Sequence, residues 1–161
     1  MTTPEESARD GAVTGPRMPP GNLADLFWTR VRETPEAPAY RQYDGDAWVD
    51  MTWAEAGRAM ARWQAAFERE GLKRGDRVAL CLHNRVEWVL FDQAALALGL
   101  VTVPLYFDDR PENMAWCLND AGVRLLLLED AGQWPVLRDQ AKSIARGVCL
   151  AGETGQDNKL V

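Results

Sequence analysis

His83 is the side chain best suited to proton transfer in this sequence, because it is the single histidine and an unperturbed imidazole titrates near neutral pH. No serine or cysteine nucleophile pattern lies beside it, so a structural or surface role is favoured. The adjacent carboxylates Asp108 and Asp109 are candidates for a metal site. A loop or helix-cap role is favoured for them, since hard cations require more oxygen ligands than two neighbours offer.

The three cysteines, Cys81, Cys117 and Cys149, lie far apart and form no Cys-x-x-Cys spacing. With a single histidine in the chain, they do not make the ligand pattern of a zinc site. Cys81 and Cys149 fall in apolar, strand-like runs, and Cys117 falls on an expected helix. We therefore expect three buried, reduced thiols. No catalytic, cofactor-binding or metal-binding residue is assigned.

A nucleotide site in an α/β protein needs free backbone amides in a glycine-rich loop at the start of a helix, just after a strand. None of the expected strand ends carries such a loop, and the segment 71–75 precedes a strand rather than following one. The segment 152–159 has two glycines and a lysine, but it lacks the Gly-Lys-Ser/Thr order, and a flexible linker is the favoured interpretation. The strand ends instead carry polar and aromatic residues: His83-Asn84, Tyr106-Phe107-Asp108-Asp109 and Glu129-Asp130.

The composition excludes several classes of protein. With 18 basic and 24 acidic residues, the formal charge is −6, which argues against binding to nucleic acid or to anionic membrane surfaces. The longest apolar runs, such as Leu125 to Leu128, are far shorter than the about 20 residues that cross a bilayer, so no integral membrane segment is expected. A hydrophobic share of 47% indicates a globular domain. Residues 1–20 have no apolar core and are expected to be a disordered tail rather than a signal peptide, and the protein is expected to be cytoplasmic.

The first half of the ordered chain predicts two helices and a hairpin. Asn22 caps a helix with apolar residues on one face, and Asp44-Gly45-Asp46 connects strands over 39–43 and 47–51. Thr52 and Glu55 form a capping box for a second helix, which Gly71 ends. The apolar faces of these helices comprise Leu23, Leu26, Phe27 and Val31 in the first, and Trp53, Ala56, Met60, Trp63 and Phe67 in the second.

The second half predicts a parallel sheet, because short apolar strands alternate with amphipathic helices. The strands are expected at 78–82, 101–105, 125–128 and 148–150, with pairing interrupted at Pro104. The helices are expected from an Asn84–Glu87 cap to Gly99, from Pro111 to Gly122, and from about 134 to 146. Arg110 is a poor cap for the helix at Pro111, and Asp109 is the alternative. The fold class is therefore α/β, with helices on both faces of the sheet.

Seven tryptophans are many for this length. The helix spacing places Trp53 and Trp63 in the core. The remaining five are expected to be mostly core residues, with exposed anchors for a partner among them, since tryptophan is favoured at interfaces. They are Trp28, Trp48, Trp88, Trp116 and Trp134.

The ordered set of these motifs resembles the N-terminal portion of adenylate-forming (AMP-binding) acyl-CoA synthetases, most closely the long-chain fatty-acid–CoA ligases. It extends over about residues 22–150. The segments that carry the resemblance are Thr34–Tyr40, Met51–Glu55, Gly75-Asp76-Arg77-Val78-Ala79-Leu80, Asn84–Trp88, Ala94–Tyr106 and Leu118–Val123. Arg110 in place of a serine or threonine cap and the loop Tyr106–Asp109 depart from the family pattern.

The resemblance implies that the parent enzyme uses ATP, Mg²⁺ and CoA to convert a fatty or other carboxylic acid into an acyl-adenylate and then an acyl-CoA. The family's phosphate loop, its other ATP-binding motifs and its catalytic lysine lie downstream of what matches here. The chain alone is therefore expected to be inactive and to hold none of these cofactors. Residues 21–151 would form an N-terminal α/β subdomain, with residues 152–161 as a linker or truncated connection. The subdomain would contribute to the wall of the acyl or CoA channel, and its expected partners are the remainder of the synthetase and, through exposed apolar surface, a second copy of the chain.

Two other functions remain open from the sequence. One is a stand-alone, non-catalytic interaction module derived from the same family. The other is an independent flavodoxin-like nucleotide-binding domain, which the absence of a glycine-rich or hydroxyl-rich turn after a strand disfavours.

Overall fold

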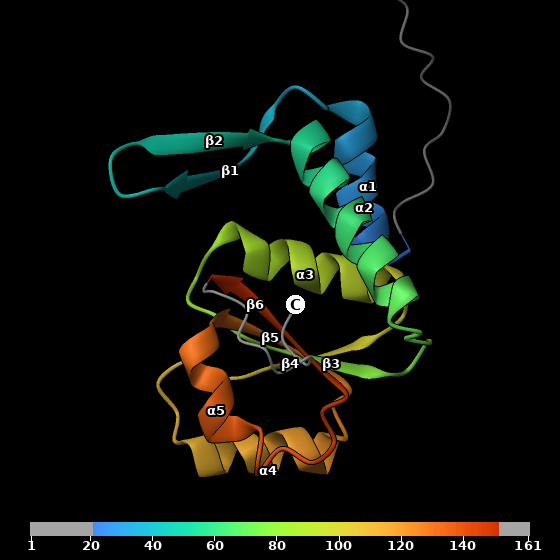
Figure 1. Ribbon diagram of the computed structural model, residues 1–161. Helices are drawn as coiled ribbons and strands as arrows, with labels where there is room; N and C mark the ends of the chain where they lie inside the picture. The colour runs from blue at the N-terminus through green and yellow to red at the C-terminus, as the bar shows by residue number, and fades with distance from the viewer. Residues whose placement is uncertain (1–20, 152–161) are drawn as a thin grey trace, which may run out of the picture.

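A four-stranded parallel sheet forms the centre of the molecule in the computed structural model, which describes residues 21–151 (Figure 1). The strand order is β4-β3-β5-β6. The expected tail over 1–20 and linker over 152–161 lie outside the described residues. The sheet strands are β3 (Arg77–Cys81), β4 (Val101–Pro104), β5 (Leu125–Asp130) and β6 (Arg146–Ala151).

Helices cover both faces of this sheet, as the sequence predicted. On one face lies α3 (Val86–Ala97), with α1 (Leu23–Glu33) and α2 (Trp53–Arg69) packed against it. The opposite face carries α4 (Pro111–Ala121) and the short helices η1 (Ala131–Gln133) and α5 (Trp134–Leu137). A separate antiparallel hairpin, β1 (Pro38–Tyr43) and β2 (Trp48–Thr52), extends beside the helices on the α3 side.

Alternate residues of the central strands enter two separate cores. Val78 and Leu80 of β3 pack under α3, whereas Ala79 and Cys81 pack against α4. The same alternation continues along β5, whose first four residues, Leu125–Leu128, are buried. A strand that is apolar on both faces requires a helical layer on each side, so the continuous apolar runs in the sequence determined this architecture.

The expected N-terminal elements are largely confirmed. Asn22 accepts a hydrogen bond from the Asp25 amide, and Thr52 and Glu55 form the reciprocal capping box. Ala56, Met60 and Phe67 are fully buried. The first helix differs from the prediction, because Leu23 and Leu26 are exposed. Its inward-packing apolar side chains are Ala24, Phe27, Trp28 and Val31.

The predicted cap of α3 is wrong. Arg85 occupies the cap position without a side-chain cap bond, and its guanidinium instead holds Glu87 at 2.8 and 3.2 Å. The free amide of Val86 donates to Gln42 Oε1 at 2.7 Å. The hairpin therefore supplies the cap that the helix lacks locally.

The helix expected over about 134–146 is also wrong, since α5 ends at Leu137 and β6 already begins at Arg146. The side chain of Asn119 on α4 donates to the Gln140 carbonyl at 2.7 Å and accepts from the Ser143 amide at 3.2 Å. The Ser143 hydroxyl donates to the Leu118 carbonyl at 2.9 Å. These contacts satisfy the backbone of an irregular segment, so a helix is not required there.

Further along the chain, α4 begins at Pro111 with Arg110 as a cap that makes no side-chain bond, as expected. β4 ends at Pro104, which lies on an edge strand where a missing donor is tolerated. Within residues 21–151, no helix has the length and apolar character needed to cross a membrane.

The motif Gly75-Asp76-Arg77 ties the amino edge of the sheet together. Arg77 donates to the carbonyls of Ala121 at 2.6 Å and Gly122 at 3.0 Å, which close the C-terminus of α4. Asp76 accepts from the Lys73 amide at 2.9 Å and pairs with Arg124. The motif thus joins the start of β3 to the turn before β5, and it does so through structural hydrogen bonds.

Replacing Arg77 with methionine should destabilise the chain by about 1–3 kcal/mol, because two partly buried carbonyls lose a charged donor while the apolar stem is kept. Urea unfolding of the full chain measures the difference. The control Arg69→Met, at an exposed position of α2, should change stability by less than about 0.5 kcal/mol. Equal losses in the two variants would contradict the structural role of Arg77.

Candidate functional site

The polar strand ends meet at the carboxyl edge of the sheet, as expected for parallel strands. The His83 ring lies against Phe107, with ring centroids 3.7 Å apart and planes inclined by 37°. Glu129 receives two contacts from the same residue: the His83 amide donates to Oε2 at 2.8 Å, and His83 Nδ1 lies 3.0 Å from that oxygen. The turns after β3, β4 and β5 are therefore joined in one cluster.

Neighbouring charges and hydrogen bonds stabilise the ionised carboxylates here. Burial acts to raise the pKa of Glu129, but the His83 amide and ring, together with Arg85, hold it below its ordinary value. Burial likewise opposes the shift at Glu87, whose pKa is lowered by its hydrogen bonds to Arg85. Arg85 lies between these carboxylates, 3.6 Å from Glu129 and 2.8 Å from Glu87. The cluster is thus a charge network whose members satisfy one another.

The nearby thiols are not arranged for nucleophilic chemistry. Cys81 is buried, and that burial raises the pKa of its thiol, which disfavours the reactive thiolate. Cys149 lies 3.5 Å from the Glu129 carbonyl. The cysteines are thiols rather than disulfides, and Cys81 is fully buried whereas Cys117 and Cys149 are partly buried.

The expected roles of the acidic pair are visible at Asp109. Its Oδ1 accepts from the Arg110 amide at 2.8 Å and from Asn113 Nδ2 at 2.9 Å, which is a loop and helix-start role. Asp108 is exposed. Within residues 21–151, no group of three or more His, Cys, Asp or Glu side chains is placed to hold a metal ion.

The carboxyl-edge turns also lack a phosphate loop. Gly132 is the single glycine in the segments 82–85, 105–110 and 130–133, and its amide already donates to Asp130 at 2.6 Å. The phosphate-loop-like segment 152–159 lies outside the described residues. The described cluster offers an oriented imidazole, 58% exposed, and an aromatic surface, with neither a nucleophile nor a metal site beside it.

The sequence predicted polar residues at the carboxyl edge of the sheet, but it did not predict the contact between His83 and Glu129. His83 and Glu129 are 46 positions apart, and no local pattern marks their contact. Arg85 and Gln42 were likewise missed, because their partners are set by how α3 meets the hairpin and the sheet.

The described segment is thus an α/β sheet whose polar groups at the strand ends contact one another. A family model described as "AMP-binding enzyme" matches residues 27–159. The chain therefore belongs to the AMP-binding enzyme family, as its motifs indicated.

Curated relatives agree with this family. The long-chain-fatty-acid–CoA ligase FadD15 of Mycobacterium tuberculosis (strain ATCC 25618 / H37Rv) is 32% identical over 108 residues, which cover 67% of this chain and 18% of the ligase. The chain thus spans about a fifth of the ligase's length. The uncharacterized protein Rv1549 of the same strain is 26% identical over 110 residues, which cover 68% of this chain and 62% of that protein.

Solved structures share the fold. An acetoacetyl-CoA synthetase from Streptomyces lividans superposes with a TM-score of 0.79 at 20% identity, covering 87% of this chain and 24% of that chain. VinN in complex with L-aspartate gives a TM-score of 0.73 at 25% identity, covering 81% of this chain and 35% of that chain. The α/β architecture is that of the N-terminal part of adenylate-forming enzymes.

Replacing Glu129 with glutamine tests the charge network through pH. The folded pKa lies below the ordinary 4.5, so the carboxylate's stabilising contribution is complete above that pH and is lost as pH falls through the folded pKa. We expect Glu129→Gln to be less stable than the parent chain by about 1 kcal/mol near neutral pH, and the difference to shrink in acid.

Thermal unfolding at about pH 7 and about pH 3.5 measures both effects. Glu68→Gln, at an exposed position of α2, is the control and should match the parent chain at both values. A difference between Glu129→Gln and the parent that is the same at both pH values would contradict the proposed network.

Proposed function

We propose that this chain is the N-terminal part of an AMP-forming fatty-acyl-CoA ligase and that it is a scaffold without catalytic activity of its own. The observation that carries the proposal is the 32% identity to a long-chain-fatty-acid–CoA ligase over 108 residues. The polar groups at the strand ends support it, because Glu129 is held within the chain by His83 and Arg85.

In the proposed parent reaction, a fatty-acid carboxylate attacks the α-phosphorus of ATP, giving an acyl-adenylate and pyrophosphate. The CoA thiolate then attacks the acyl carbon and AMP leaves. Such a reaction requires neutralisation of phosphate charge and in-line positioning. The described residues do not fit a Mg²⁺ site, since no cluster of three potential ligands exists among residues 21–151. In this proposal, ATP, Mg²⁺ and CoA are held by the remainder of the ligase.

This chain's own contribution is to support and position. The hydrogen bonds of Asp76 and Arg77 hold together the edge of the sheet where the strands begin. The His83–Glu129 contact holds together the edge where the strands end. A rigid sheet of this kind gives the remainder of the ligase a fixed surface on which to assemble the acyl and CoA channel.

The full chain should form no acyl-adenylate from ATP, Mg²⁺ and a long-chain fatty acid, because residues 21–151 hold no phosphate loop and no cluster of three potential metal ligands. Release of radiolabelled pyrophosphate and formation of labelled adenylate measure this. ATP should also leave the melting temperature unchanged, since a ligand that binds the native state raises it. Adenylate formation by the chain alone would overturn the claim that it is inactive.

A chimera tests the positive half of the proposal. Residues 21–151 replace the matched segment of the FadD15 ligase, and acyl-CoA formation is measured with the same fatty acid. We expect activity from the chimera and none from the ligase lacking the segment. A folded chimera that binds ATP but forms no acyl-CoA would contradict a shared role for the two segments.

A stand-alone interaction module is the second candidate, and one observation favours it. The match to Rv1549 covers 62% of that protein, so a short relative consists largely of this segment. An antibody against this chain, used on extracts of its source cells, distinguishes the two functions. A band near 18.0 kDa would favour the module, and a band several times larger would favour a part of a full ligase.

A further inference from the structure

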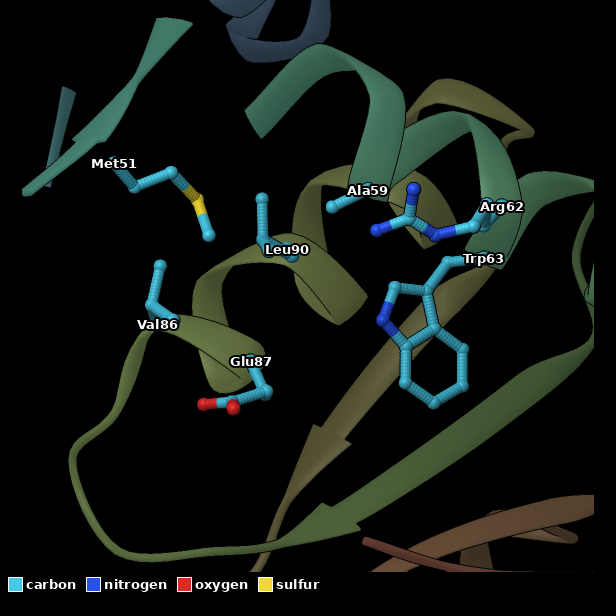
Figure 2. A pocket seen from close by; sticks show the side chains of 7 residues that line it. All are labelled: Met51, Ala59, Arg62, Trp63, Val86, Glu87 and Leu90. Carbon is cyan, nitrogen blue, oxygen red and sulfur yellow. The ribbon is translucent and has the colours of Figure 1, made fainter. Parts of the chain in front are cut away.

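An open apolar groove runs from the inner face of the β1–β2 hairpin into the space between α2 and α3. It consists of two adjoining cavities that share Met51 and Val86, and we call it the hairpin groove. One cavity, of about 320 Å³, lies beneath the hairpin and is lined by Tyr40, Gln42 and Val49. The other, of about 420 Å³, is shown in Figure 2, where Met51 extends from β2 towards Val86 and Leu90 on α3.

The floor of this groove includes the buried core residues Ala59 and Leu90, but its hairpin side chains are more exposed. Val49 is 52% exposed, whereas Met60 and Phe67 on the adjacent α2 are fully buried. On the other face of the same hairpin, Tyr43 and Trp48 pack on each other with their ring centroids 5.5 Å apart. These side chains are 52% and 67% exposed. A two-stranded hairpin is marginally stable by itself, so covering its apolar side chains would be favourable.

The charges at the groove favour an occupant that carries a carboxylate. Glu87 and Arg62 both line the second cavity. The Glu87 carboxylate is already held by Arg85, whereas Arg62 makes no hydrogen bond or ion pair within the described residues 21–151. Asp44 lines the first cavity, but its carboxylate accepts hydrogen bonds from the amides of Asp46 and Ala47 in the hairpin turn. The groove therefore presents an apolar floor and an available cation at Arg62.

We propose that the hairpin groove is the docking surface for the remainder of the acyl-CoA ligase, which inserts apolar side chains and pairs a carboxylate with Arg62. This inference rests on the proposed function. The matched segments cover 18% of the FadD15 ligase and 24–35% of the solved chains described above, so most of such a ligase lies outside this segment. The two faces of the parallel sheet are already covered by helices, so the surfaces left for a large partner are the hairpin side and the edge strands β4 and β6.

Another cavity of similar volume, about 340 Å³, lies at the carboxyl edge of the sheet and is lined by Trp88, Tyr106 and Phe107 among others, but no unpaired cation of the described residues lines it. The other exposed apolar side chains of residues 21–151 are spread over separate elements, as is normal for a protein surface. They include Val101 on β4, Tyr106 in the following loop, Trp116 on α4 and Val136 on α5.

Hydrogen exchange on a co-expressed complex tests the proposal. The full chain, carrying an affinity tag, is produced together with the FadD15 ligase lacking its matched segment, and the co-purifying complex is compared with the chain alone. Amides of 40–51 and 86–90 should exchange at least about tenfold more slowly in the complex. Amides of α4 should not change.

Substitutions at the groove provide a second measurement. Val49→Lys and Arg62→Glu should each weaken association by about tenfold or more, since one places a charge in an apolar contact and the other reverses the paired charge. Val136→Lys is the matched control, because Val136 is 49% exposed but lies on the opposite side of the sheet. None of the three should lower the melting temperature of the chain alone by more than a few degrees, which separates docking from folding.

Four results would overturn the inference. A complex protected elsewhere, or weakened equally by Val49→Lys and Val136→Lys, would reject the groove as the docking surface while leaving the proposed function intact. Absence of any complex would reject docking, and the chimera's activity would decide the proposed function separately. A dimer of the chain alone in sedimentation, lost in Val49→Lys, would assign the groove to a second copy.

Discussion

Two strands that are buried on both faces impose the arrangement of everything else in this molecule. β3 and β5 lie side by side in the sheet, and their side chains alternate between the core under α3 and the core above α4. Both faces of such a pair are apolar and exposing either to water is unfavourable, so helices must cover each side of the sheet. α1 and α2 then add a further layer on α3, because α3 is itself apolar beyond the stripe that touches the sheet.

Two sets of hydrogen-bonded polar groups lie on this sheet, one at the amino ends of the strands and one at their carboxyl ends. At the amino edge, Asp76 and Arg77 hold the turns before β3 and β5, and this explains the Gly-Asp-Arg motif without any catalytic role. At the carboxyl edge, where ligands bind in comparable folds, His83, Arg85 and Glu129 satisfy each other.

Local signals in the sequence predicted structure well where their partners lie within a few residues. The capping box of Thr52 and Glu55 is of this kind, as is the turn of the hairpin, and the apolar runs correctly gave the parallel sheet. Contacts between distant segments were not predictable in the same way. The cap that Gln42 supplies to Val86 spans 44 positions, and the segment after α5 is irregular because Asn119 on another helix holds its backbone.

In the candidate site, too, local features were predictable from the sequence and contacts between distant segments were not. Strand ends were located from the sequence, which placed His83 and Glu129 at one edge, but their contact depends on the order of strands in the sheet. The exposure of tryptophans was also decided by tertiary packing. Trp134 is buried, whereas Trp48 and Trp116 are exposed, and nothing in their immediate neighbours distinguishes them.

The order of strands also determines when this segment can fold during synthesis. β3 lies between β4 and β5, and its first paired residue on β5, Leu125, is made 47 positions after Val78. Until that residue leaves the ribosome, one edge of β3 is unpaired and the core under α3 lacks Leu125 and Leu127. The apolar side chains that the α1–α2–α3 layer presents to the sheet are therefore covered only in part, by β3 and β4, until β5 has been synthesised.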